Sequence, residues 1–198
     1  MVRNVTIGRT VMLDTLAWRR FGAEARFPLD RDTLQIVAQG LVELDDGGFV
    51  HRFYTDDHVM FQLLTTDRAG LHVNDISLFA PWDSSYPASG GEREAWLRRI
   101  SSSTFQAAGL PVFERLWFGA DEGLQPPVTF WEELHDDRDG RVDRRIFQSC
   151  MLYARELGPA GAGEGRELLL AIEQEEDGQP VSHEVMIGVP LELGEFRV

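Results

Sequence analysis

The feature that most constrains this chain is a series of β-prone runs between Leu34 and Leu64. The three runs, 34–44, 49–54 and 58–64, are separated by Asp45-Asp46-Gly47-Gly48 and by Thr55-Asp56-Asp57. An Asp-Gly pair between β-prone runs is a strong short-range indication of a hairpin turn. We therefore expect a β-meander here, with 71–79 as a fourth strand of the same sheet.

Helical patterns in the rest of the chain are few and short. Residues 11–21 begin like a strand and continue as a helical turn, and Ser89-Gly-Gly-Glu92 has capping-box spacing before a short helix at 93–100. Later segments complete the pattern: 128–134 favours a strand, 146–157 fits a strand or a helix, 158–165 is an exposed glycine loop, and 168–174 and 184–193 are expected to be two late strands.

Most of these β-runs are adjacent in sequence, with few helices between them. This order favours antiparallel pairing over a doubly wound parallel sheet. The chain shows no internal repeat and no low-complexity linker. The sequence thus predicts one α+β domain over residues 1–198, built on an antiparallel β-rich meander sheet with a few short helices.

All nineteen basic residues are arginine, and the chain contains no lysine. A P-loop needs a lysine on the nucleotide phosphates, a protein kinase needs its strand lysine, and Schiff-base chemistry needs an amine that can lose its proton. The missing residue type therefore excludes all three enzyme classes.

The net charge of −14 argues against partners that are themselves anionic. Such a field repels phosphate backbones and anionic lipid headgroups, so we expect no nucleic-acid binding. No segment approaches the roughly 18 apolar residues of a membrane span, and the N-terminal residues have no apolar stretch of signal-peptide length, so we expect no membrane insertion. The single cysteine, Cys150, lies in an apolar run and is expected to be a buried thiol. These features predict a cytoplasmic protein.

Two polar stretches superficially resemble metal sites. His51, Asp56, Asp57 and His58 offer transition-metal donors, but their spacing matches no ligand pattern, and His51 shares a strand face with phenylalanines. The stretch 135–140 places acidic side chains at alternate positions before a glycine, but its first ligand would be a histidine, which is a poor calcium donor. We interpret the first as a packed, hydrogen-bonded histidine beside a turn and the second as a solvated turn.

Catalytic motifs are equally weak. The glycines of 161–165 lack the G-x-G-x-x-G spacing, and the serines lie outside any G-x-S-x-G elbow. We assign no catalytic, cofactor-binding or metal-binding residue from the sequence, and the pattern favours a non-enzymatic protein.

Four aromatic residues in loop-like segments are candidates for partner binding: Trp82, Tyr86, Trp117 and Trp131. Loop aromatics often anchor protein partners. Packing of the same side chains beneath loops is the alternative interpretation.

Seven short motifs, in order along nearly the whole chain, carry a family resemblance. They are Gly8-x-x-Val11-x-Leu13-Asp14-x-Leu16, His51-Arg-Phe-Tyr54, Asp75-Ile-x-Leu-Phe79, Arg115-Leu-Trp117, Pro126-Pro-Val-x-Phe130-x-Glu132, Met151-Leu-Tyr-x-Arg155 and Ile187-Gly-Val-x-Leu191. With them the chain resembles the YjfK-like family of bacterial proteins of unknown function (DUF2491). The resemblance implies a cytoplasmic accessory protein encoded near a phage-shock-protein-A-like membrane-stress protein, and it supplies no catalytic residue. Because the chain begins close to the first motif, comparison with the family pattern leads us to expect that the family's leading segment is missing here.

The leading hypothesis is therefore a protein-binding adaptor of a bacterial envelope-stress system, with a phage-shock-protein-A-like protein as partner. The alternative is a small-ligand binder or metal-dependent enzyme whose site is assembled from distant residues such as His51, Asp57 and Asp75. A third possibility is a homo-oligomer that forms through exposed strand edges.

Overall fold

The structure is a computed structural model that describes residues 4–119, 121, 123–158 and 165–198. In chain order its elements are β1 (Thr10–Leu13), α1 (Leu16–Arg19), the 3-10 helix η2 (Gly22–Glu24), β2 (Thr33–Glu43), β3 (Phe49–Thr55), β4 (Met60–Thr65), β5 (Val73–Ser85), α2 (Gly90–Ile100), β6 (Thr104–Phe105), β7 (Phe113–Arg115), β8 (Val128–His135), β9 (Arg144–Leu157), β10 (Gly165–Glu176), β11 (Ser182–Pro190) and β12 (Phe196–Arg197).

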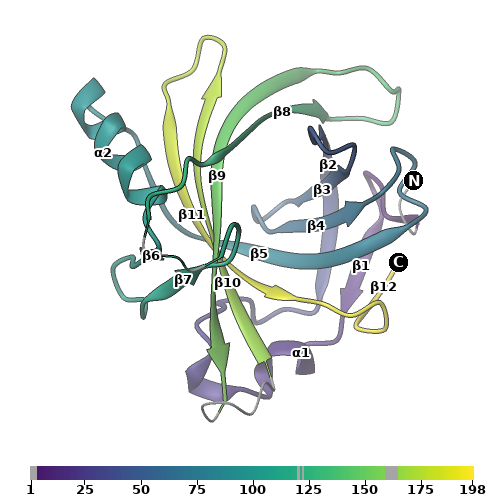
Figure 1. Cartoon of the computed structure of the whole chain (residues 1–198). Helices are drawn as coiled ribbons and strands as arrows, with labels where there is room; N and C mark the ends of the chain where they lie inside the picture. The colour runs from purple at the N-terminus through teal and green to yellow at the C-terminus, as the bar shows by residue number, and fades with distance from the viewer. Residues whose placement is uncertain (1–3, 120, 122, 159–164) are drawn as a thin grey trace.

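Eight antiparallel strands close into a barrel in the order β2-β3-β4-β5-β11-β10-β9-β8 and back to β2. Strand β8 closes the ring, because one of its edges pairs with β9 and the other pairs Gln39–Val42 of β2 with 132–135. Figure 1 shows β8 running across the upper part of the molecule from beside β9 to beside β2. The remaining strands extend the sheet as short flaps, with β1 and β12 beyond β2 and with β7 and β6 beyond β9.

The expected α+β fold with a meander sheet is therefore wrong. The fold is nearly all β, and the helices of the described residues are the four-residue α1, the three-residue η2 and the eleven-residue α2. The strand pairs β2-β3, β3-β4 and β4-β5 form where the sequence placed them, but they are one wall of a closed barrel. The ambiguous segment 146–157 lies within the long strand β9, and 128–134 lies in β8 as expected.

The protein has two hydrophobic cores, one inside the barrel and one on its outer face, because side chains alternate between the two faces of each strand. The barrel interior is filled by one face of the strands, including Val50, Met60, Phe79, Cys150 and Leu170. The residues between them point to the other face, where they form a larger core outside the barrel. Successive residues of a strand point to opposite faces of the sheet, so each of the central strands contributes to both cores.

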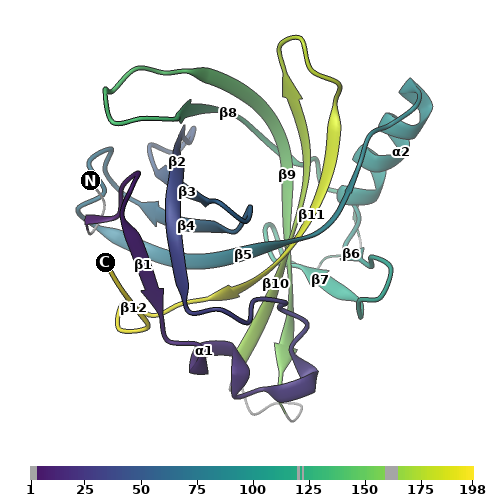
Figure 2. The same ribbon diagram turned by 180° about the vertical axis from the view of Figure 1, so that it is seen from behind.

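Peripheral segments cover the outer core. The segment around α1 buries Trp18 against Phe27, with ring centroids 5.2 Å apart, and α2 buries Trp96 against Phe105 at 5.9 Å. Figure 2 shows α1 below the barrel and α2 beside the upper ends of β9–β11. Ser89 caps α2 as expected, because its hydroxyl accepts a hydrogen bond from the Glu92 amide at 3.3 Å.

Two further expectations concern the loop and the membrane. The glycine loop expected at 158–165 falls largely on 159–164, outside the described residues. Among the described residues, no helix has the length and apolar character that a membrane crossing requires.

Candidate functional site

One end of the barrel interior is hollow. A cavity of about 510 Å³ lies there, and its walls come from β2, β3, β4, β5, β8 and β9. Apolar side chains line it, among them Val50, Leu64, Phe130 and Leu152. Ligand pockets commonly have volumes of roughly 300–1,000 Å³. The hollow is thus large enough for a small organic molecule.

A buried polar network lies in the barrel beside this cavity, centred on Arg52 and Glu132. Arg52 Nη1 donates to Glu132 Oε2 at 2.9 Å and to Gln148 Oε1 at 2.6 Å, and Arg52 Nε donates to Gln62 Oε1 at 2.9 Å. Glu132 also accepts hydrogen bonds from the Gln148 amide at 2.8 Å and from the Tyr54 hydroxyl at 2.7 Å. Four strands, β3, β4, β8 and β9, contribute to this one network.

The two charged side chains of the network are buried and face each other as an ion pair. The side chains of Arg52 and Glu132 are 2% and 0% exposed. Burial is the largest single influence on Arg52 and would lower its pKa, but Glu132, Tyr54 and Cys150 together outweigh it, and the pKa is raised above its usual value. Burial first, and then Glu132, raise the pKa of Tyr54. Burial also raises the pKa of the Cys150 thiol to about 12, so this cysteine stays protonated.

Gly40 makes room for the network. A Cβ atom at this position of β2 would lie 1.8 Å from Glu132 Oε1 and 2.8 Å from its Cδ. Strands β2 and β8 pair at this point, with Gly40 opposite Leu134. Closure of the barrel and burial of the carboxylate therefore both depend on a residue without a side chain here.

The mouth of the cavity lies between the β2–β3 turn and the loop that follows β7. Trp117 and Phe118 of this loop line the cavity, with Phe118 59% exposed. Arg115, which is 2% exposed, holds the loop by donating to the carbonyl groups of Ser101, Gly119, Asp121 and Gly123 at 2.8–3.1 Å. Phe118 has φ +66°, in the left-handed region that costs free energy for a residue with a side chain.

Arg52 has one more hydrogen-bond donor than the network uses. Among the residues the structure describes, Arg52 Nη2 has no hydrogen-bond partner, whereas Nε and Nη1 both do. Arg52 lines the cavity, as do Gln62 and Ser77. The site therefore offers hydrogen-bond donors next to apolar walls, which is the composition of a pocket for an amphipathic molecule.

The four aromatic candidates lie in different environments. Trp117 is in the cavity wall, whereas Trp82 packs on the outer core and donates from Nε1 to the Ala108 carbonyl at 3.1 Å. Tyr86 and Trp131 are 65% and 56% exposed. The structure therefore does not bring the four residues together into one surface, and their role in partner binding stays a prediction.

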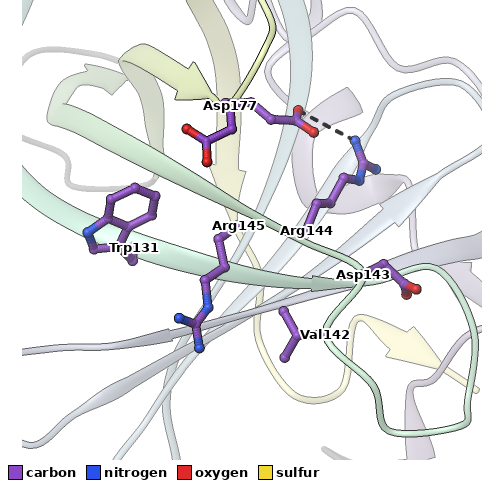
Figure 3. Close-up of a pocket in the computed structure, with 7 residues that line it drawn as sticks. Trp131, Val142, Asp143, Arg144, Arg145 and Asp177 are labelled. Atoms are coloured by element: carbon purple, nitrogen blue, oxygen red, sulfur yellow. Dashed lines mark ion pairs between the residues drawn. The ribbon is translucent and has the colours of Figure 1, made fainter.

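Trp131 borders a separate hollow of about 670 Å³ on the outside of the barrel, with Val142, Arg144 and Arg145. Figure 3 shows Trp131 and Arg145 side by side above neighbouring strands, and the dashed ion pair joins Arg144 to Glu176, with 3.8 Å between Arg144 Nη1 and Glu176 Oε2. Trp131 also contacts Phe147, with ring centroids 5.3 Å apart. This hollow is lined by solvated ion pairs and has no buried polar network among the described residues.

The residues of the enzyme alternative do not converge. His51 is buried on the outer face of β3, Asp57 pairs with Arg31 at 3.0 Å, and Asp75 lies on the cavity wall. Burial lowers the pKa of His51, and the nearby Asp67 partly opposes this shift. Neither ring nitrogen of His51 has a hydrogen-bond partner among the described residues, so the expected hydrogen bond of this packed histidine is absent there.

Metal ligation finds no support in the described part of the chain, where no three His, Cys, Asp or Glu side chains are grouped to hold an ion. His135 is the half-buried last residue of β8, and 136–140 form an exposed turn, in which the Asp139 amide donates to the Asp137 carboxylate at 2.7 Å. Cys150 is fully buried in the barrel interior, as expected.

The polar network was not predicted from the sequence. Arg52 and Glu132 interrupt two strand faces that are otherwise apolar, and a buried arginine almost always has a partner. Both residues also lie in motifs that carried the family resemblance. A charged residue at an inward position of each strand was the available indication, but nothing in the sequence showed that β3 and β8 lie on either side of β2.

Comparisons with known proteins agree with the resemblance in the sequence motifs. The family model described as "Protein of unknown function (DUF2491)" matches residues 1–197. The "Uncharacterized protein YjfK" of Escherichia coli (strain K12) is 27% identical over 150 residues, which cover 73% of this chain and 66% of that relative. The matched part is thus just under two thirds of the relative's length. No solved structure matches significantly.

Proposed function

Because this chain belongs to the DUF2491 family, whose function is unknown, we propose a function from its geometry: the protein binds a small amphipathic molecule inside the barrel. The observation that carries the proposal is the 510 Å³ cavity that joins apolar walls to the donors of Arg52 and Gln62. The apolar side chains that line an empty cavity lack van der Waals contacts on one side, and a bound ligand would supply them.

The buried end of the ligand is best matched by a neutral hydrogen-bond acceptor. Glu132 already balances the charge of Arg52, so a second carboxylate beside it would be repelled by Glu132 and would pay the cost of desolvation. A carbonyl or ether oxygen facing Arg52 Nη2 satisfies the remaining donor at a lower cost. The apolar part of the ligand then lies against Val50, Leu64 and Leu152.

The same site favours binding over covalent chemistry. Nucleophilic catalysis needs a nucleophile within hydrogen-bond reach of a base. The described residues that line the cavity include no histidine and no cysteine, so the Ser77 hydroxyl in the wall has no imidazole beside it to take its proton.

The proposal is tested with a neutral solvatochromic dye, Nile red, whose fluorescence rises in an apolar pocket. The wild-type protein should bind about one equivalent, and Ser77→Trp, which places an indole in the cavity, should lower dye affinity at least about tenfold. Ser85→Trp makes the same change at an exposed position of the same strand and should bind like the wild type. Equal dye binding by both variants would place the dye elsewhere and contradict the proposal.

Protein binding is the second candidate function, and one observation favours it: Trp131 is 56% exposed beside Phe147 on the outside of the barrel. Exposed tryptophans are frequent anchors of protein interfaces. The partner that follows from the family resemblance is a phage-shock-protein-A-like protein in the cytoplasm. Trp131→Ala should abolish capture of such a protein in a pull-down and leave the melting temperature nearly unchanged, whereas unchanged capture would remove this surface as the interface.

A further inference from the structure

The charges around the cavity mouth differ from those at its floor. Four carboxylates line the cavity: Glu43, Asp45 and Asp46 at the β2–β3 turn, and Asp75 on β5. Arg52 is the only cation among the described lining residues, and Glu132 neutralises it at 2.9 Å. The mouth is therefore acidic, while the floor is close to neutral.

Two of these carboxylates remain available to a ligand. Glu43 has only a long contact to Arg68, 3.5 Å between two side chains that are both more than half exposed. Asp75 lies between the cavity and a second groove lined by Arg166, but Arg166 itself pairs with Glu156 at 3.3 Å. Exposed pairs of this kind contribute little and exchange readily with other partners.

Aromatic rings complete the mouth. Trp117 and Phe118 line the same cavity as the carboxylates, and Arg115 fixes the loop that carries both rings. An ammonium group near an aromatic face is attracted by the ring quadrupole, and nearby carboxylates add to the attraction. The net charge of −14 further raises the local concentration of cations around the protein.

We infer that the cavity is specific for a cationic amphiphile, with a neutral hydrogen-bond acceptor at its buried end and an amine or quaternary ammonium group at the mouth. The inference rests on the proposed function, because it assumes that the cavity is a ligand site. It adds the charge and the orientation of the ligand. The carboxylates of the mouth and the rings of Trp117 and Phe118 hold the cation, and Arg52 Nη2 donates to the acceptor.

Three probes with the same eight-carbon chain and the same amide at one end isolate the charge at the other end. They are 8-aminooctanamide, octanamide and the monoamide of octanedioic acid. Each is titrated against the full chain by displacement of Nile red at low salt. The amine should bind on the order of tenfold more tightly than octanamide, and the anionic probe should bind more weakly than octanamide. This order should flatten as salt is raised toward 1 M, because exposed charges are screened.

A pair of variants identifies the groups responsible. Asp75→Asn should reduce the preference for the amine over octanamide about threefold or more and leave octanamide affinity unchanged. Asp139→Asn removes the same charge from an exposed turn outside the cavity and should keep the full preference. If Asp75→Asn lowered affinity for all three probes equally, a structural effect would be indicated and the inference overturned.

The outcomes separate this inference from the proposed function. Displacement by all three probes with equal affinity, or a preference for the anion, would overturn the cationic ligand and leave the binding site intact. Failure of every probe at millimolar concentration, together with no difference in dye binding between Ser77→Trp and the wild type, would overturn both.

Discussion

Arg52 and Glu132 are 80 residues apart in the sequence and form an ion pair of 2.9 Å inside the barrel, with side chains 2% and 0% exposed. Their strands are not hydrogen-bonded to each other: β3 pairs with β2 and β4, and β8 pairs with β2 and β9. Both strands flank β2, so the pair crosses over β2 on the inner face of the barrel, where Gly40 leaves room for the Glu132 carboxylate.

Glu132→Gln should lower the free energy of unfolding by about 3–5 kcal/mol, because it leaves the buried guanidinium of Arg52 without a balancing charge. Denaturant titration measures the loss. Glu133→Gln is the matched control, since the neighbouring carboxylate pairs with the 62% exposed side chain of Arg145 and should change stability by less than about 1 kcal/mol. Similar losses in both variants would show that the network does not stabilise the barrel.

The first wall of the barrel could be predicted from the sequence, because its information is local. The Asp-Gly turn and the alternating runs of 34–64 place β2, β3 and β4, and the next strand joins them directly. Closure depends instead on β8 pairing with β2, where Gln39–Val42 lie opposite the distant residues 132–135. No local sequence pattern specifies such a pairing. Without the pairing of β8 with β2, the strands would form an open sheet, which is why the sequence led to the expectation of an α+β fold.

The candidate site could be predicted only in part for the same reason. The sequence identified Trp117 as a candidate, but it offered partner binding and core packing as alternatives, and the side chain lies in a cavity wall. Arg52, Gln62, Glu132 and Gln148 come from four strands and meet only after closure. Their inward positions were visible in the strand pattern, but their neighbours were not.

Gly40→Ala should destabilise the protein by about 1–3 kcal/mol, because the new methyl group would overlap Glu132 Oε1, which the Tyr54 hydroxyl holds in place. Thermal unfolding measures this loss. Gly90→Ala is the control, since nothing lies within 4 Å of its added Cβ and alanine is favourable in a helix. A Gly40→Ala variant as stable as the wild type would mean that Glu132 can move without cost.

Arg115→Met should release the loop that carries Trp117 and Phe118, because four carbonyl groups lose their shared donor. We expect a loss of at least about 2 kcal/mol and faster amide exchange at Leu116 and Trp117, whose amides donate to the Leu152 carbonyl. Arg115→Lys should not restore the loop, because an ammonium group lacks the planar fork of donors. If Arg115→Lys restored the stability and the slow amide exchange of the loop, the positive charge of Arg115 would be sufficient and its planar set of donors would not be needed.

Stability should fall as the pH is lowered from 7.5 to 5.5, and His51 should account for part of the slope. Burial lowers the pKa of His51 in the folded state, so the unfolded chain binds the proton first. A histidine whose pKa is lower in the folded than in the unfolded protein favours unfolding as the pH falls below its unfolded pKa of about 6.5. Each tenfold difference in proton affinity between the folded and the unfolded protein corresponds to about 1.4 kcal/mol. His183 has a pKa lowered by burial as well, although its contact with Glu173 opposes the shift, and it adds to the slope with the same sign.

His51→Leu should therefore make the free energy of unfolding less dependent on pH over this range, measured by denaturant titration at each pH. An unchanged slope in His51→Leu would mean that His51 has the same pKa in the folded and the unfolded protein, which would contradict the lowering of its pKa by burial.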